Sequence, residues 1–579
     1  MAFSDNNLSG SKYKRFVAKL TEIFYEFSLF ERVLAFVFAA LLAYASFSIV
    51  LKLNGQFLVE VPAEGGQLEE GMLATPRFVN PVLATSDTDR DLSALMYSGL
   101  LRLNAAGELV PDLAESFTIS EDGLTYYFKL RENAVFHDGT PVTTGDVIFT
   151  ILKTQDPAIK SPKRPNWDGV RAEVINEQEI EFTLSSPYSP FIYNTTLGIL
   201  PEHKWKDITA EEFPFSSLNT NPVGSGPYEL SGVKKDEDEI ITSYELKSFS
   251  KYAIKKPYIE KMFIAFFKNE AEMIVAFDKK QITSMHSVTP SNIAGLNLKK
   301  ESVVTLPYSR IFALFFNQNK SAVLTDKNLR DVLDTAINRE EIVESVMSGY
   351  ATPLYSPLTL FSNSTSTQKT YGIDEARLKL ADLGDKYSTG TSTDADGGST
   401  QKVSFTIATN DVPEFVAVGS KIVDAYNAIG INTELKIYDT NDLTANIIRP
   451  REYEAILFGN VINRDLDYYA FWHSSQRNDP GLNLASYTSI EGDRALEESR
   501  SSIDIEEKLP LLQKFENQVI NDIPAVFLYS PDFIYVVPQI VRAQYPQIIV
   551  TPADRFAEVY NWYIETDTVW KIFAQKDEE

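Results

Sequence analysis

Alternating apolar and polar positions predict a chain that mixes strands and helices. Leu124 to Leu130 is an apolar and aromatic run between two turns, and Ile180 to Leu184 alternates as a half-buried strand does. Thr143 lies three residues before Asp146, at the start of an apolar stripe. That spacing predicts a capping box and a helix that begins at this point.

The later part of the chain predicts a βαβ unit. Val403 to Ala408, Pro413 to Ala428 and Ile431 to Tyr438 have the patterns of a strand, a helix and a strand. Such short spacing favours parallel strands with a right-handed crossover. Glu454 to Gly459 is predicted to be the next strand. Ligands of α/β sheets bind beyond the carboxyl ends of strands, so residues 460–472 are expected to contribute to a site.

One segment is apolar enough to cross a membrane. Val33 to Leu51 carries no charge over 19 residues between Arg32 and Lys52, which is the length that a hydrocarbon core of about 30 Å requires. Ala43-Tyr44-Ala45 could instead be the cleavage site of a signal peptide. The apolar run continues past that site, which favours an uncleaved anchor. Basic residues ahead of it favour a cytoplasmic N-terminus, with the large domain outside.

Two polar segments are expected to connect folded parts. Residues 56–70, which include Glu64-Gly-Gly66, have the composition of a short tether. Ser388 to Gln401 is rich in Gly, Ser and Thr and is expected to form a flexible surface loop. The globular part is expected to begin at about Gly71.

Length and composition predict a folded protein with several lobes. At 579 residues the chain exceeds the roughly 250 to 300 residues at which a single core stops growing. Hydrophobic residues make up 44%, which is enough for several cores. The net charge of −26 argues against nucleic acid binding, because phosphate recognition depends on clustered Lys and Arg. Acidity alone more often reflects a soluble surface than a cationic ligand.

The residue types exclude several kinds of site. The chain has no Cys, and therefore no disulfide, no thiolate metal site, no cysteine nucleophile and no lipidated cysteine. Its four His are scattered without the spacing of a zinc site. The glycines of Asn221 to Tyr228 lack the Lys-Ser/Thr ending of a phosphate loop. We therefore expect no metal, no cofactor, no catalytic residue and no enzyme activity.

Several separated motifs resemble one known family, in which they occur in the same order. They span residues 72–565. The motifs are Ser120-x-Asp-Gly123, Tyr127-x-Lys-Leu-Arg131, Phe136-His-Asp-Gly-Thr-Pro141, Asp146-Val147, Gly224-Ser-Gly-Pro-Tyr228, Leu329-Arg330 with Ala336-Ile-Asn-Arg339, Arg451-x-Tyr-x-Ala-x-Leu457 and Ile523-Pro-Ala525. Together they resemble the bacterial extracellular solute-binding proteins of family 5, which are the peptide, dipeptide, oligopeptide and nickel receptors of ABC importers.

The resemblance implies a mixed α/β fold of the periplasmic-binding-protein type (type II, cluster C). This is a two-lobed flytrap with an extra third domain, preceded here by one N-terminal transmembrane helix. The first lobe would be assembled from residues 72–99, 219–310 and 531–579, the extra second lobe would be 100–218, and the third would be 311–530. Ahead of them would lie a cytoplasmic segment 1–32, the transmembrane segment 33–51 and a tether 52–71.

The resemblance also implies a function without catalysis. The chain would be a monomeric, membrane-anchored receptor that captures a peptide or similar small solute between two lobes and delivers it to an ABC permease with cytoplasmic ATPases. Alternatives are a surface sensor or interaction module with the same fold, and a hydrolase that uses paired carboxylates. With 80 Asp and Glu, chance pairs are certain, so they do not favour the hydrolase. His137-Asp138 is explained by its turn, which is expected to hold the second lobe together.

Candidate ligand-binding residues are Phe78, Asn80, Trp167, Arg310, Asn460, Asn463, Asp465, Tyr468 and Trp472. In peptide receptors of the family, an Asp shortly after the strand holds the ligand's α-amino group. That position falls here on Ile462 or Asn463, which counts against a peptide specifically. Asp465 could bind a cationic group or cap a helix over residues 465–472. Trp167 could line a pocket or fill the second lobe.

Overall fold

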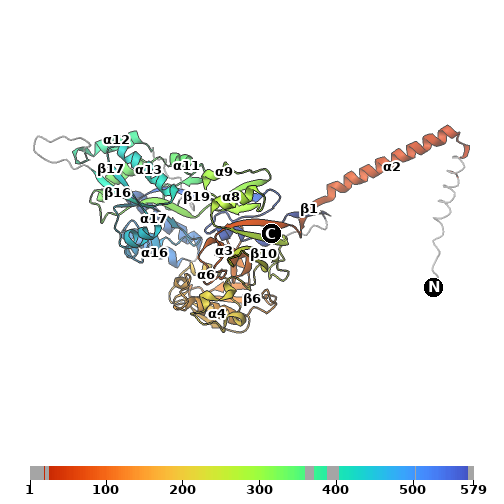
Figure 1. Cartoon of the computed structure of the whole chain (residues 1–579), viewed down its shortest axis with the longest axis horizontal. Helices are drawn as coiled ribbons and strands as arrows, with labels where there is room; N and C mark the ends of the chain where they lie inside the picture. The colour runs from red at the N-terminus through yellow and green to blue at the C-terminus, as the bar shows by residue number, and fades with distance from the viewer. Residues whose placement is uncertain (1–18, 20–24, 359–370, 388–402, 503, 572–579) are drawn as a thin grey trace, which may run out of the picture. The chain divides into compact units, whose positions relative to one another are not determined.

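The computed structural model describes residues 19, 25–358, 371–387, 403–502 and 504–571 (Figure 1). The chain divides into two units, one of Met1–Ala63 with Glu565–Glu579 and one of Glu64–Ile564. The expected surface loop 388–401 and most of the expected cytoplasmic segment 1–32 lie outside the described residues.

The first unit contains one long helix, α2 (Leu29–Phe57). It begins with a capping box, in which Ser28 N–H donates to Glu31 Oε2 at 2.8 Å. Leu29–Ile49 is the one described helical segment that is long and apolar enough to span a membrane, and it overlaps the predicted span. None of this segment is buried in the structure, so α2 is not a core helix.

A two-stranded ribbon follows α2. β1 (Leu58–Ala63) pairs antiparallel with β20 (Glu565–Trp570). Residues 52–71, predicted as a tether, contain the end of α2, all of β1 and the start of β2 (Gln67–Leu73). Glu565–Trp570, which lie in the segment predicted to close the first lobe, pair with β1.

The second unit is built around a sheet of 12 strands. Its main order is β17-β16-β18-β14-β19-β12-β2-β11-β10-β9, and β13 and β15 also pair with β19. β19 (Ala525–Pro538) pairs with β14 through its first half and with β12 and β13 through its second half. The others are β9 (Tyr228–Lys235), β10 (Ile241–Ser248), β11 (Lys261–Phe267), β12 (Ser284–His286), β13 (Glu301–Pro307), β14 (Arg310–Phe316), β15 (Ala351–Pro353), β16 (Ser404–Asn410), β17 (Asn432–Tyr438) and β18 (Ala455–Val461).

Three parts of this unit have apolar cores of their own. The half of the large sheet with β2 and β9–β12, together with α3 (Asp87–Met96), is called the first lobe below. The half with β14 and β16–β18 is called the third lobe, and it has a core on each face of the sheet. A separate four-stranded sheet is called the second lobe. The exact residue limits of the lobes remain predictions.

The third lobe contains the predicted βαβ unit. β16 and β17 pair in parallel and are joined by α13 (Pro413–Ala428), which confirms the prediction. The apolar pattern of residues 326–347 forms two helices, α10 (Lys327–Thr335) and α11 (Arg339–Ser345). Further helices of the second unit are α8 (Glu270–Asp278), α9 (Pro290–Ile293), α12 (Ile373–Asp382), α14 (Thr440–Asp442), α15 (Tyr469–Trp472), α16 (Ile490–Ser501), α17 (Ile505–Asp522) and the short 3-10 helix η7 (Pro552–Phe556).

The second lobe lies at one side of the second unit, at the bottom of Figure 1. Its strands have the order β5-β6-β8-β7 and pair antiparallel. The predicted helix is α4 (Thr144–Gln155), and Thr143 N–H donates to Asp146 Oδ2 at 2.9 Å, which confirms the capping box. The remaining elements are β3 (Leu101–Leu103), β4 (Leu109–Pro111), β5 (Ala114–Ile119), β6 (Thr125–Leu130), β7 (Arg171–Val174), β8 (Glu179–Thr183), α5 (Arg164–Trp167), α6 (Phe191–Asn194) and α7 (Glu202–Trp205).

The turn around His137 joins the second lobe to the turn that leads into β9. His137 N–H donates to the Gly224 carbonyl at 2.7 Å. Gly224 N–H donates to Nδ1 of the His137 ring at 3.2 Å, and Nε2 lies 3.1 Å from the Gly226 carbonyl. Because Nδ1 accepts, the neutral ring carries its proton on Nε2 and donates it to Gly226. The His137 turn was expected to hold the second lobe together, and it also fastens that lobe to the first.

This contact is expected to make the free energy of unfolding depend on pH. Removal from water lowers the pKa of His137 to about 4. Between pH 6.5 and 4 the unfolded chain, with an ordinary pKa of about 6.5, binds a proton that the folded chain does not, so stability falls with falling pH. At about 1.4 kcal/mol per pKa unit, the wild type should lose about 3 kcal/mol more than His137→Asn over this range. Denaturant unfolding at both pH values measures this difference, and equal losses would contradict it.

Candidate functional site

A cavity of about 250 Å³ lies where α3 of the first lobe faces loops of the second lobe. This volume is close to the lower end of the roughly 300 to 1,000 Å³ of small-molecule sites. The cavity is lined by Pro81, Ala84, Arg90, Ser93, Ala94, Tyr97, Lys163, Asn166, Trp167, Tyr193, Asn194, Thr196, Leu197 and Gly198.

Local hydrogen bonds fix the start of α3 at the edge of the cavity. Ser86 Oγ accepts from Asp89 N–H at 3.1 Å, which caps the helix. Asp89 Oδ1 accepts in turn from the backbone N–H groups of Arg77 at 2.8 Å and Phe78 at 2.9 Å. The loop before α3 is thereby held on the helix, and the lining residues of α3 have a fixed orientation.

Two cations and two unpaired hydroxyls line the cavity. Loss of water lowers the pKa of the Lys163 ammonium, and the neighbouring Arg90 lowers it further. No carboxylate of the described residues lies within ion-pair distance of Lys163. The hydroxyls of Ser93 and Tyr97 are buried and have no hydrogen-bond partner in the described part of the chain. A ligand with an anionic group would stabilise this arrangement, because a desolvated cation gains most from a direct partner.

Tyr193 connects the cavity to the segment after β18. Burial raises the pKa of the Tyr193 phenol, and the Asp465 carboxylate nearby raises it further. Burial also raises the pKa of Asp465 to about 6, and the neighbouring Asp467 contributes to this shift. Asp465 Oδ1 accepts from Asp467 N–H at 3.0 Å. The third lobe thus brings a partly buried carboxylate to the side of Tyr193.

The predicted helix over residues 465–472 is shorter in the structure. α15 contains only Tyr469–Trp472, and Tyr468 occupies its N-cap position. Asp465 forms a turn ahead of the helix and does not cap it, which corrects the alternative role proposed for it. The segment between Val461 and Tyr468 is instead held by side chains, since Lys508 Nζ donates to the Asp465 carbonyl.

Arg500 of α16 connects the third lobe to the second. Its Nε lies 3.1 Å from Asp467 Oδ2, and its guanidinium lies between two rings, 4.3 Å from Tyr469 and 4.8 Å from Tyr188. Tyr188 OH donates to Asp467 Oδ2 at 3.2 Å. Ser189 N–H donates to the Arg500 carbonyl at 2.9 Å. Both lobes therefore supply groups to one polar contact beside a second cavity of about 410 Å³.

Two of the nine predicted ligand residues lie at or beside the first cavity. Trp167 is 3% exposed and packs against Phe182 and Phe191, so it fills the second lobe, and it also lines the cavity. The two roles proposed for Trp167 are therefore combined. Asp465 approaches the cavity through Tyr193.

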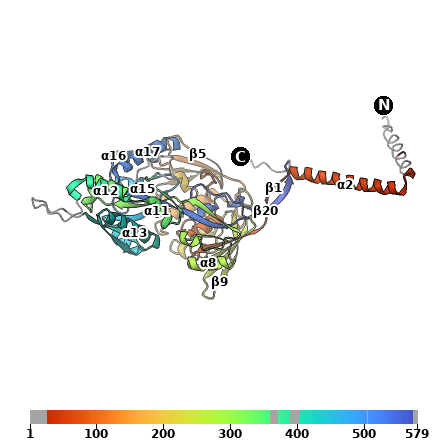
Figure 2. The ribbon, with the colours of Figure 1, turned by 90° about the horizontal axis from the view of Figure 1, so that it is seen from above.

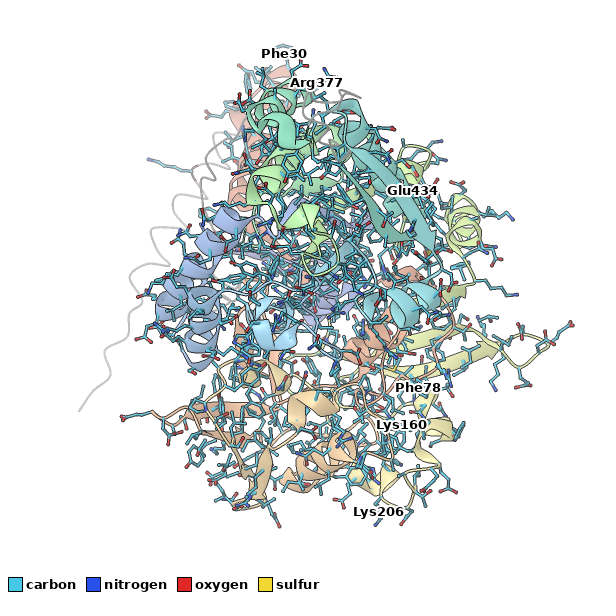
Figure 3. All side chains as sticks on the ribbon, turned by 90° about the vertical axis from the view of Figure 1, so that its left-hand side faces the viewer. Phe30, Phe78, Lys160, Lys206, Arg377 and Glu434 are labelled. Carbon is cyan, nitrogen blue, oxygen red and sulfur yellow. The ribbon has the colours of Figure 1, made fainter. Side chains whose placement is uncertain are left out.

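Phe78 and Asn80 belong to the loop before α3. Phe78 is half-buried, and Figure 3 shows it at the level where the second lobe meets the rest of its unit. Asn80 is fully buried and both ends of its amide are used: Nδ2 donates to Asn219 Oδ1 at 3.0 Å, and Oδ1 accepts from Val82 N–H at 2.9 Å. Asn80 therefore holds the loop, and its side chain is not exposed to a ligand.

Arg310, Asn460 and Asn463 do not line the cavity. The guanidinium of Arg310 lies 4.0 Å over the Tyr308 ring, and its Nη2 donates to Tyr308 OH at 2.5 Å. Asn460 is 6% exposed and its amide has no hydrogen bond to a described residue. Asn463 is exposed. Arg310 begins β14, Asn460 lies within β18 and Asn463 follows β18, and none of the three lines the cavity with Trp167.

Tyr468 and Trp472 are core residues of the third lobe. Tyr468 is fully buried and its OH donates to the Pro357 carbonyl at 3.1 Å. Trp472 is 2% exposed and packs against Phe315, Phe515 and Phe527. The structure therefore does not place these two aromatic side chains at the cavity.

Sequence reasoning missed Arg90, Ser93, Tyr97, Lys163 and Tyr193. Lys163 had a signal, because Ser161-Pro-Lys-Arg-Pro-Asn-Trp167 places two cations beside a Trp in a Pro-flanked loop of a strongly acidic protein. The α3 residues had none, because an amphipathic helix does not reveal which polar positions face a neighbouring lobe.

Two α/β lobes joined by a long strand, with an added lobe and a polar cavity, define a solute-binding protein of the type II periplasmic class. CtaP, an ABC transporter substrate-binding protein of Listeria monocytogenes, has this fold with a TM-score of 0.72 and 25% identity, over 87% of this chain and 100% of CtaP. NikZ of Campylobacter jejuni in complex with Ni(L-His) has a TM-score of 0.67 and 24% identity, over 86% of this chain and 99% of NikZ.

The chain belongs to family 5 of the bacterial extracellular solute-binding proteins. The family's profile, described as "Bacterial extracellular solute-binding proteins, family 5 Middle", matches residues 108–481. Oligopeptide-binding protein AppA of Bacillus subtilis (strain 168) is 26% identical over 487 residues, which cover 81% of this chain and 87% of AppA. The resemblance drawn from the motifs and the predicted fold class are confirmed. The homologues of this chain are substrate-binding proteins.

Proposed function

We propose that this chain is the extracytoplasmic receptor of an ABC importer, and that its solute carries both an anionic and a cationic group, as an unmodified peptide does. The observation that carries the proposal is the charge arrangement of the cavity. Lys163 and Arg90 line it, and Asp465 lies beside its Tyr193. A carboxylate of the solute would pair with Lys163, and an amino group would pair with Asp465. The name of AppA supports a peptide.

Closure of the lobes follows from the same arrangement. The cavity walls belong to the first and second lobes, whereas Asp465 belongs to the third. A solute that contacts both sides stabilises the closed state by the difference between its affinities for the two states. The Arg500 contact with Tyr188, which is present in this structure, would stabilise that state. The solute would then pass to the permease, whose cytoplasmic ATPases supply the energy for import.

We further propose that α2 is retained as a single-pass anchor and places the second unit outside the cytoplasm as a monomer. Its apolar segment continues past Ala45, and α2 ends only at Phe57, where β1 begins. A helix of this length exceeds the 20 or so residues that a bilayer core requires. An anchor of this kind would replace the lipidated cysteine that the chain lacks.

Removal of either charge is expected to weaken binding of an unmodified peptide at least tenfold, or about 1.4 kcal/mol. A thermal-shift screen of peptides, sugars and metal complexes identifies a ligand for residues 56–579. Calorimetric titration then compares Lys163→Gln and Asp465→Asn with the wild type. Lys163→Gln should not weaken the binding of a C-terminally amidated peptide, because that peptide has no terminal carboxylate to pair with Lys163. Asp465→Asn should likewise not weaken the binding of an N-acetylated peptide, because that peptide has no terminal amino group to pair with Asp465.

Lys160→Gln is the matched control for Lys163→Gln. Lys160 is exposed and lies three residues before Lys163 (Figure 3), so its removal should leave the affinity unchanged.

The affinity of the wild type should also decrease below pH 6, because the pKa of Asp465 is about 6 and its protonated form cannot pair with an amino group. Binding of uncharged sugars alone, or equal affinities of all variants, would contradict the proposed solute.

A further inference from the structure

The ribbon of β1 and β20 holds the last described strand against the end of α2 (Figure 2). Leu58 pairs with Trp570 and Val59 with Val569, and the register continues to Ala63 and Glu565. Lys571 N–H donates to the Phe57 carbonyl at 2.7 Å. Backbone hydrogen bonds therefore fix Trp570 beside the residue at which α2 ends.

Apolar and acidic residues separate along this ribbon. We call Phe57–Val59 together with Val569–Lys571 the near end, because it adjoins α2. The near end contains Phe57, Leu58, Val59, Val569, Trp570 and Lys571, with no acidic residue. Glu60, Asp567 and Glu565 all lie further along the strands and are exposed. Trp570 is 47% exposed and Phe57 is 57% exposed, so the described part of the first unit leaves both side chains accessible.

The near end of the ribbon lies at a distance from the apolar segment of α2 that matches the thickness of the lipid headgroup layer. Lys52 is the first charged residue after the apolar run and marks the edge of the hydrocarbon core. Phe57 lies five residues further, about 7.5 Å along the axis at roughly 1.5 Å per residue. The headgroup layer on each side of the core is roughly 5 to 8 Å thick. The near end of the ribbon therefore reaches the depth at which Trp is enriched in membrane proteins.

We propose that the near end of the ribbon is a membrane-surface contact, whose partner is the headgroup layer of the extracytoplasmic leaflet, with Trp570 lying at headgroup depth. The indole combines an apolar body with an N–H donor, and such side chains prefer the boundary between hydrocarbon and water. Lys52 and Lys571 favour anionic lipids, and the acidic residues remain on the water side. This contact rests on the proposed retention of α2.

Fluorescence of the full-length chain in lipid vesicles tests the contact. Of its five Trp, Trp167, Trp205, Trp472 and Trp562 are at most 3% exposed, so only Trp570 is accessible to a quencher. The vesicles contain phosphatidylcholine and phosphatidylglycerol, and a fraction of the phosphatidylcholine carries a nitroxide on its headgroup. We expect quenching of the wild-type emission, and loss of that quenching in Trp570→Phe.

Trp472→Phe is the matched control and should retain the quenching. A nitroxide near the end of the acyl chain should quench Trp570 less than the headgroup nitroxide does. If the chain floats with the vesicles but Trp570→Phe is quenched as much as the wild type, the contact is overturned and the anchor stands. If the chain does not float, both are overturned. Peptide binding by residues 56–579 is measured without a membrane, so failure of the solute proposal is detected separately.

Discussion

Replacement of Arg555 by methionine is expected to lower the free energy of unfolding by about 3 to 5 kcal/mol, the range observed when one partner of a buried ion pair is removed. Arg555 Nη2 lies 2.9 Å from Glu70 Oε1 and 2.8 Å from Asp91 Oδ2, and all three side chains are fully buried. Without Arg555, two carboxylates would remain in the core of the first lobe, with His286 3.0 Å from Asp91.

The ionised state of Asp91 depends on this cluster. Burial alone would raise the pKa of Asp91, but Arg555 and His286 outweigh burial and keep the pKa below its usual value. Asp91 lies on α3, between the cavity residue Arg90 and the cavity residue Ser93. We therefore expect Arg555→Met to weaken solute binding as well, because the orientation of α3 depends on the anchored Asp91.

Chemical denaturation followed by Trp fluorescence at pH 7 measures the loss. Arg377→Met is the matched control, since Arg377 lies on the surface (Figure 3), where its pairing with Asp374 is exposed to water. In the double variant Glu70→Gln with Arg555→Met, the loss should be smaller than the sum of the single losses, because one unpaired charge is removed. A loss no larger than that of Arg377→Met would show that the cluster does not stabilise the fold.

Replacement of Gly224 by alanine is expected to destabilise the protein by roughly 4 kcal/mol or more, a loss that is exceptional for one methyl group. A Cβ at this position would overlap the carbonyl oxygen of Met96, the last residue of α3. Neither the Met96 carbonyl nor the backbone of Gly224 can move away easily. Gly226 N–H donates to the same Met96 carbonyl at 3.0 Å, and His137 binds Gly224 through its backbone and its ring.

Gly295→Ala is the matched control for Gly224→Ala. The nearest atom to a Cβ on Gly295 is the Asn292 carbonyl oxygen at 3.5 Å, an ordinary contact. Its free energy of unfolding should therefore stay close to that of the wild type, as measured by the same denaturation. Equal stabilities of the two variants would mean that the end of α3 can move away from the turn, in contradiction to the packing argument.

The local elements were largely predictable because their causes are local. The Thr143 capping box, the β16-α13-β17 unit and strands β6, β8 and β18 follow from side-chain periodicity and cap chemistry. The failures were long-range. The apolar residues Leu58, Val59 and Val61 suit a strand, but β20, the strand that pairs with them, lies far away in the sequence, so no local pattern predicts the ribbon.

The candidate site was only partly predictable for the same reason. Trp167 and Asp465 were named from the sequence, but the choice between pocket and core could not be made for any aromatic residue. Tyr468 and Trp472 occur in the expected segment, yet both face the core of the third lobe. Lys163 and Tyr193 come to the cavity from loops that the sequence alone does not place beside α3.

Motifs, periodicity and composition can be read along the chain, and they sufficed to predict the family, the mixed α/β class, the apolar helix and the absence of cysteine chemistry. Which side chains share a cavity and which charges are buried together became clear only from the folded arrangement. Lys163, Tyr193 and Asp465 acquire their chemistry from burial and from neighbours in other lobes. Desolvation and pairing depend on distance in space, and no local pattern of residues records that distance.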